Sequence, residues 1–113
     1  MEPRLKAEIW VKAHIRKCSV QNIPVFVTRR GDDTAGSVLI KINRLNNMCM
    51  VLIPTTDFSD GSRKWLQGTG TDWVEESKAD AYIEKQISFD RDCWVIEIED
   101  QEGRHFLEEK VEA

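Results

Sequence analysis

Residues 37–54 constrain the fold more than any other stretch of the chain. They hold two runs rich in β-branched and aliphatic residues, 37–45 and 48–54, joined at Asn46-Asn47. Asn tolerates the left-handed backbone that a tight turn between antiparallel strands needs, so the stretch predicts a β-hairpin. The second run is apolar on both faces, which is typical of a central strand covered on both sides. We expect the other elements to pair with this hairpin or to pack against it.

A first helix is expected over residues 5–20. Val11, Ile15 and Cys18 recur there at i, i+4 and i+7, which is the spacing of one helical face. The same stretch also alternates apolar with polar residues, as a strand would, so a short strand at residues 5–8 ahead of the helix is the alternative. The length of the stretch favours the helix.

A second helix and several strands follow from the rest of the chain. Residues 75–89 carry an apolar stripe at helical spacing, made by Ala79, Tyr82, Ile83, Gln86 and Ile87. Residues 55–74 are rich in Gly, Thr and Ser and read as a long irregular loop, in which residues 63–66 form either a short strand or a turn of helix. Strands are expected at residues 25–29, where Pro24 is compatible with a strand end or a sheet edge, and at 93–99 and 104–107.

Together these elements predict an α+β fold. It consists of an antiparallel sheet of about five strands with two helices packed on one face, in the order α-β-β-β-loop-α-β-β. The first three strands are expected to form an antiparallel meander. The 113 residues suffice for one domain over 1–113. Its ordered core is expected at about residues 4–108, followed by a C-terminal tail that frays.

Composition argues against several functional classes. No apolar run reaches the roughly 20 residues of a membrane helix, and the N-terminus lacks an apolar signal region, so we expect a cytoplasmic protein without a membrane partner. The net charge of −4 makes nucleic acid an unlikely partner. The three cysteines are widely spaced, and neither histidine has a second His or Cys at ligand spacing. We therefore expect buried reduced thiols, no metal and no cofactor.

Four basic residues are candidates for an anion-binding face. Arg29, Arg30, Lys41 and Arg44 fall on or beside the first two strands of the expected meander. Paired across the sheet, some of them would share a face with the glycine amides of the intervening turn. The simpler interpretation is a solvated strand face, and we favour it because charged faces are routine in half-exposed antiparallel sheets.

Tryptophans are the candidates for partner binding. Trp65 and Trp73 flank the Gly/Thr-rich loop, and Trp10 stands at the edge of the apolar stripe of the first helix. Exposed tryptophan is a common anchor of protein interfaces. The alternative, which we favour, is that these residues pack onto a small core.

The two histidines give no catalytic signature. Asp100 and His105 could form a histidine–carboxylate pair across a turn, but no nucleophile is identifiable beside them, and we assign no catalytic residue. His14 is surrounded by Lys12, Arg16 and Lys17 in the sequence, and we expect it on the surface.

Short motifs along the chain resemble a known family. They are Trp10-Val11-Lys12-Ala13, Arg29-Arg30-Gly31-Asp32 with Ala35-Gly36, Asp80-Ala81-Tyr82-Ile83 with Gln86, Phe89-Asp90-Arg91-Asp92, and Trp94-Val95-Ile96-Glu97-Ile98-Glu99-Asp100 with Gly103-Arg104-His105-Phe106. In their order and spacing, which span almost the whole chain, the sequence resembles the bacterial domain-of-unknown-function family number fourteen ninety-one. The resemblance implies a cytoplasmic bacterial protein, and it implies no activity and no catalytic residue.

Two functional classes remain. The first is a non-enzymatic protein-binding or adaptor module, suggested by the small size, the loop tryptophans and the lack of a catalytic or metal signature. The alternative is a small anion-, nucleotide- or nucleic-acid-binding protein or enzyme that uses the basic residues. The expected partner is a protein, and exposed strand edges are compatible with a homodimer.

Overall fold

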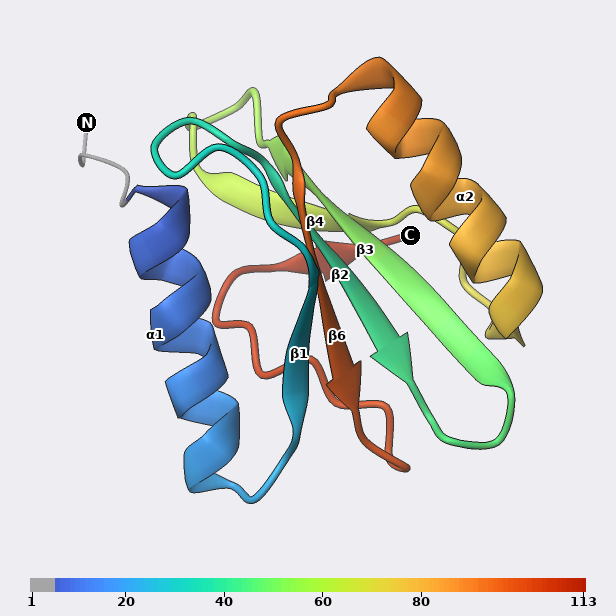
Figure 1. The fold of residues 1–113 in the computed structure, drawn as a ribbon. Coiled ribbons are helices and arrows are strands. Elements are labelled where there is room, and N and C mark those ends of the chain that lie inside the picture. The colour runs from blue at the N-terminus through green and yellow to red at the C-terminus, as the bar shows by residue number, and fades with distance from the viewer. Residues whose placement is uncertain (1–5) are drawn as a thin grey trace.

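The computed structural model describes residues 6–113, so the start of the expected ordered core at residue 4 lies outside it (Figure 1). Within that range the chain forms two helices and one mixed sheet of seven strands. The helices are α1 (Ala7–Val20) and α2 (Glu76–Phe89). The strands are β1 (Val25–Arg29), β2 (Val38–Asn43), β3 (Met48–Thr56), β4 (Arg63–Gln67), β5 (Val74–Glu75), β6 (Trp94–Glu99) and β7 (Val111–Glu112).

The predicted hairpin is confirmed. β2 and β3 pair antiparallel, with Ile40 opposite Leu52, across a turn at residues 44–47. Asn47 has a φ of 68°, the left-handed conformation that Asn tolerates. Every residue of β2 and the central part of β3 are buried, which confirms that these strands are covered on both faces.

The predicted antiparallel meander is wrong. The strand order is β1-β6-β2-β3-β4-β7, with β5 pairing beside β3. β6 therefore lies between β1 and β2, antiparallel to the first and parallel to the second. β4 and β7 are also parallel, so the sheet is mixed. Parallel neighbours need a long crossover connection, which α2 helps to supply on the way to β6.

The connection from β1 to β2 passes over the start of β6 instead of making a hairpin. Asp32 N donates to Asp92 O at 2.9 Å, and Trp94 Nε1 donates to Asp32 O at 2.7 Å. A Cβ on Gly31 or Gly36 would collide with the carbonyl oxygen of Asp92. The two glycines thus allow the loop to lie directly on the turn before β6, which holds β1 and β2 apart.

The two helices lie on opposite faces of the sheet, so the prediction that both pack on one face is wrong (Figure 1). Side chains alternate between the faces along a strand. Val38, Ile40 and Ile42 of β2 pack in the core that includes Val11 of α1. Leu39 packs in the core that includes Ala79 and Ile83 of α2. The buried and half-buried residues of α2 are those of its predicted stripe, together with Glu76 at its start.

Helix α1 forms as expected, and the predicted face of Val11, Ile15 and Cys18 packs against the core. Its buried residues are Ala7, Val11, His14 and Cys18. The expectation that His14 lies on the surface is wrong, because its side chain sits on this face and is 5% exposed. The alternative was a short strand at residues 5–8. Residues 7 and 8 belong to the helix instead, residue 6 is in neither a helix nor a strand, and residue 5 lies outside the described range.

The C-terminal segment completes the α1 side of the sheet. The strand predicted at residues 104–107 is absent, and Phe106 there has a φ of 60°. Phe106 and Leu107 instead pack against the α1-side core. The tail, which we expected to fray, contains β7, and β7 pairs with β4. Residues 63–66 are part of strand β4, which decides between the two predicted alternatives for that segment.

Candidate functional site

The four basic residues do not form one face. The guanidinium of Arg30 lies 5.0 Å from the ring centroid of Trp94, and that of Arg44 lies 5.0 Å from that of Trp73. Arg29 donates to a backbone carbonyl in the turn before β6. Only Arg29 and Lys41 line the same hollow.

Lys41 lies under α2 and is held by acidic side chains. Its Nζ is 2.8 Å from Glu76, 2.7 Å from Asp80 and 3.5 Å from Glu97, and its side chain is 7% exposed. Asn43 Nδ2 donates to Glu97 at 3.0 Å. Burial alone would lower the pKa of Lys41, but the hydrogen bonds to Asp80 and Glu76 and the charge of Glu97 outweigh it and raise that pKa above its usual value. Lys41 is therefore a charged structural residue whose charge is already neutralised.

The candidate tryptophans belong mainly to the interior. Trp65 is fully buried, opposite Pro54 in the β3–β4 pair, and cannot contact a partner in this structure. Trp10 is half-buried and stacks on His14 with a centroid distance of 4.9 Å. Trp73 is half-buried and packs against the α1-side core.

Asp100 and His105 each take other partners. Asp100 Oδ2 accepts hydrogen bonds from the backbone N and the Nε of Arg104, both at 2.9 Å. The Arg104 side chain lowers the pKa of the Asp100 carboxyl. His105 Nδ1 accepts from the backbone N of Leu107, and its carbonyl faces His14 Nε2 at 2.9 Å. The histidine–carboxylate pair that the sequence suggested is not formed.

β1 is one of the two end strands in the order of the sheet, a position with which Pro24 is compatible. β1 pairs only with β6 within residues 6–113. Glu99 N donates to Pro24 O at 3.1 Å, and backbone groups alternate in direction along a strand. The N–H and C=O groups of Val25 and Val27 therefore point away from the sheet. Phe26 and Val27 are 50% and 43% exposed, so this open edge also carries apolar surface on both sides.

An open groove runs beside this edge on the α2 side. α2 lies over β2, β3 and β5, which leaves a hollow of about 450 Å³ between α2 and β1. Its acidic lining residues are Asp80, Glu84 and Glu97, and its basic ones are Arg29 and Lys41. The formal net charge of the lining is therefore 2 − 3 = −1. The groove has an apolar floor and walls with a small acidic excess. The remaining lining residues are Thr28, Ile83, Ile87 and Val95.

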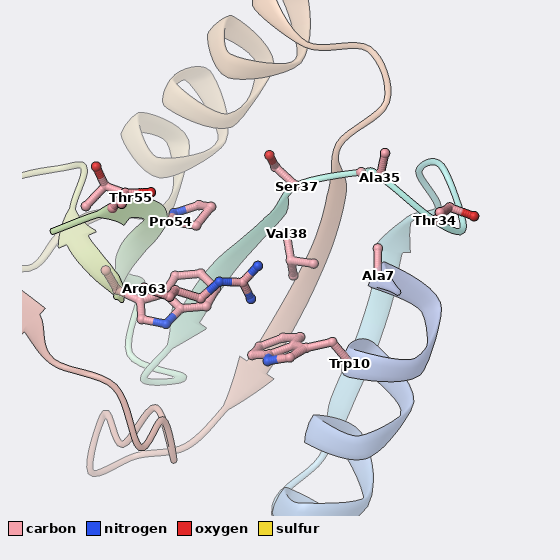
Figure 2. Close-up of a pocket in the computed structure, with 12 residues that line it drawn as sticks. Ala7, Trp10, Thr34, Ala35, Ser37, Val38, Pro54, Thr55 and Arg63 are labelled. Atoms are coloured by element: carbon pink, nitrogen blue, oxygen red, sulfur yellow. The ribbon is translucent and has the colours of Figure 1, made fainter. Parts of the chain in front are cut away.

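A second hollow, of about 230 Å³, lies at the N-terminal end of α1 (Figure 2). It is enclosed by the start of α1, by the loop before β2 and by the facing parts of β3 and β4. None of the sequence motifs indicated this place, because its residues come from four separate segments. Its lining residues include Ala7, Trp10, Val38, Thr56, Arg63 and Trp65.

Nowhere in residues 6–113 do three or more His, Cys, Asp or Glu side chains gather in a way that could hold a metal ion. Neither described helix has the length and apolar character to cross a membrane.

Comparison with known proteins gives a family without an assigned activity. A family model described as protein of unknown function (DUF1491) matches residues 5–108. A crystal structure of a DUF1491 family protein from Caulobacter crescentus CB15 is similar, with a TM-score of 0.85 and 39% identity over 96% of this chain and 99% of that one.

Two solution structures are also similar. The NMR structure of a DUF1491 family protein from the same organism has a TM-score of 0.83 and 39% identity over 99% of this chain and 100% of that one. Protein Atu0922 from A. tumefaciens has a TM-score of 0.72 and 26% identity over 86% of each chain. No curated protein matches the sequence. The match over residues 5–108 confirms the resemblance seen in the motifs, and the chain belongs to the DUF1491 family of proteins of unknown function.

Proposed function

We propose that the protein is a non-enzymatic binding module that takes an extended segment of a partner protein along the outer edge of β1. The observation that carries this proposal is the open edge itself. The backbone groups of Val25 and Val27 point outward without a neighbouring strand, and Phe26 and Val27 expose apolar surface beside them. An added strand would pair those groups and cover that surface, which is how β-strand addition generates affinity.

The groove beside β1 suggests the chemistry of the partner. Side chains of an added strand alternate between the two faces of the sheet. Those on the α2 side would lie next to Phe26, whose strand partner is Glu97. Glu84 forms part of the same groove and is exposed. A segment that combines an apolar residue with Lys or Arg fits this side best.

The alternative that uses the basic residues as an anion-binding face has less support. Lys41 is neutralised by three carboxylates, and Arg30 and Arg44 each cover a different tryptophan. We retain protein binding as the proposed function for this reason. It uses the edge strand in place of the tryptophan side chains.

The test compares partner capture by the wild type with capture by Val27→Pro. Proline removes the outward N–H of Val27 without touching the hydrogen bonds between β1 and β6, and edge strands tolerate it. Val27→Thr is the matched control because it keeps the N–H and the preference for a strand. Tagged proteins of equal thermal stability are used to capture partners from the cytosol of the source cells, and bound proteins are quantified by mass spectrometry.

The proposal expects a stoichiometric partner that the wild type and Val27→Thr retain and Val27→Pro loses. Equal retention by Val27→Pro would refute strand addition, and so would the absence of any retained protein. The mass of the free protein in solution is measured alongside. A dimer that Val27→Pro dissociates would assign the edge to a second copy of the chain and not to a different protein.

A further inference from the structure

Residues 104–109, which we call the strap, lie against α1 and lead into β7 (Figure 1). We propose that the strap is an acid-opened device: it is closed over α1 while His14 and His105 are neutral, and it detaches when they are protonated. The inference rests on two hydrogen bonds, on the charges around the two imidazoles and on how the strap is anchored at its ends. It goes beyond the proposed function, because β1 and β7 lie at opposite ends of the strand order.

The first hydrogen bond joins His14 of α1 to the strap. His14 Nε2 lies 2.9 Å from the carbonyl oxygen of His105. A carbonyl only accepts, so Nε2 carries the proton and the neutral ring keeps a lone pair on Nδ1. His14 is 5% exposed and stacks on Trp10, with 4.9 Å between the ring centroids. A second proton would place a charge on a ring that is nearly out of contact with water, and opening of the strap would return that charge to water.

The second hydrogen bond lies within the strap and requires a neutral His105. The Nδ1 atom of His105 accepts from the backbone N of Leu107 at 2.9 Å. This bond spans Phe106, whose φ of 60° is a left-handed conformation that few residues other than Gly and Asn adopt. A protonated Nδ1 would be a donor that faces another donor, so the bond would be lost. Protonation of His105 therefore removes a contact that supports the turn by which Phe106 and Leu107 reach the α1-side core.

The charged groups around the two rings leave both histidines neutral in the closed form. On α1, Lys17 disfavours protonation of both rings. On the strap, Glu109 favours protonation of the α1 histidine, and Glu108 is paired with Lys17 at 3.3 Å. In the turn before the strap, Asp100 is paired with Arg104 at 2.9 Å. Burial has the largest influence on the pKa of each histidine and holds it below 6.5.

The anchors at the two ends of the strap titrate at lower pH than the histidines. At the start, Arg104 lowers the pKa of the Asp100 carboxyl. After the strap, β7 pairs with β4, and Lys64 and Lys110 lower the pKa of the Glu112 carboxyl in β7. As the pH falls below 6.5, the histidines therefore gain protons before these carboxylates do. The strap opens between two anchors that stay in place.

Opening of the strap exposes one face of α1. Trp10, Ala13, His14 and Lys17 follow one another at helical spacing and line a hollow whose other wall is residues 107–109. When that wall moves away, the four side chains form a continuous exposed surface on the helix. The strap thus makes the exposure of an aromatic helix face depend on acidity.

The test measures backbone NMR order parameters of the full chain at about pH 7.5 and about pH 5. Residues 105–109 report on the strap, and Ile40 of β2 and Ile96 of β6 report on the rest of the fold. The double variant His14→Gln/His105→Asn keeps both hydrogen bonds and cannot titrate. Gln carries an amide N–H for the carbonyl of residue 105, and the Asn side chain accepts from the backbone N–H two residues on. His105→Ala removes the acceptor at every pH.

In the wild type, the order parameters of the strap should fall from about 0.85 at the higher pH to below about 0.6 at the lower pH, while Ile40 and Ile96 stay rigid. The double variant should keep a rigid strap at both pH values, and His105→Ala should have a mobile strap at both. A wild-type strap that stays rigid at the lower pH, equal loosening in the double variant, or loosening that occurs only together with Ile40 and Ile96 would overturn the proposal. If the double variant does not fold, His105→Asn takes its place: less loosening than in the wild type supports the strap, and equal loosening overturns it.

Discussion

Replacing Lys41 by Met tests whether the cluster under α2 stabilises the fold. The ammonium group lies 2.7–3.5 Å from the carboxylates of Asp80, Glu76 and Glu97. Met keeps most of the side-chain volume and removes the charge. The three carboxylates then face one another without a counter-ion, and α2 loses its charged contacts with Lys41 while it keeps its apolar stripe on the sheet.

The exposure of the partners sets the size of the effect. Removing one partner of a fully buried ion pair costs about 3–5 kcal/mol. The side chains of Glu76 and Asp80 are 39% and 56% exposed, so water can solvate them in the variant. Glu97 is 15% exposed and has less access to water. We therefore expect Lys41→Met to lower the free energy of unfolding by about 2 kcal/mol, which is roughly 8 °C in Tm for a domain of this size.

Chemical denaturation at neutral pH measures this loss, and a double-mutant cycle identifies its source. Glu97→Gln in the Lys41→Met background should recover about 1 kcal/mol, because the least solvated charge is then removed. Lys78→Met, at an exposed position of α2, should change stability by less than about 0.5 kcal/mol. A loss below about 0.5 kcal/mol for Lys41→Met, or no recovery with Glu97→Gln, would refute the reasoning.

Three further predictions concern the α1 side and the loop before β2. Trp65→Ala should lower the free energy of unfolding by about 3–5 kcal/mol in urea because the indole is fully buried, and a loss under about 1 kcal/mol would contradict its place in the core. Burial lowers the pKa of His14 and of His105 below 6.5, so the unfolded chain binds more protons below that pH. Stability is therefore fully present above the unfolded pKa of 6.5 and should fall as the pH drops below 6.5 through the lowered pKa values of the folded protein, less steeply in His14→Gln, whereas an unchanged urea midpoint would count against this. Gly36→Ala should lower Tm by several degrees because a Cβ would collide with the carbonyl of Asp92, and a wild-type Tm would mean that the loop does not lie on that turn.

The local elements were largely predictable from the sequence, because their signals are local. The periodicity of residues 75–89 gave helix α2 with its stripe, and the two apolar runs gave the β2–β3 hairpin. The apolar character of the second run on both faces also indicated that both faces of the sheet are covered. The prediction that both helices pack on one face was inconsistent with this apolar character. A sheet that is covered on both faces needs packing elements on both, and α1 and α2 lie on opposite faces.

The neighbours of each strand were not predictable in the same way. Nothing in residues 94–99 indicates that β6 inserts between β1 and β2, because a strand pattern records burial and not partner identity. The prediction that four basic residues share one face failed for the same reason, because it assumed the wrong strand neighbours. From the sequence alone, Lys41 is interpreted as a surface charge. In the fold, the crossover connection places α2 and its carboxylates over Lys41. The hollow at the N-terminal end of α1 was missed because its lining comes from segments distant in sequence.

Amide hydrogen exchange in β1 of the free protein tests the central claim most directly, because that claim is an open edge with outward-facing backbone groups. We predict fast exchange at the amides of Val25 and Val27 and slow exchange at Phe26, whose backbone faces β6, with Val25 and Val27 becoming protected when a partner segment binds. Equal protection of all three amides in the free monomer would contradict an open edge, and with it the proposed mode of binding.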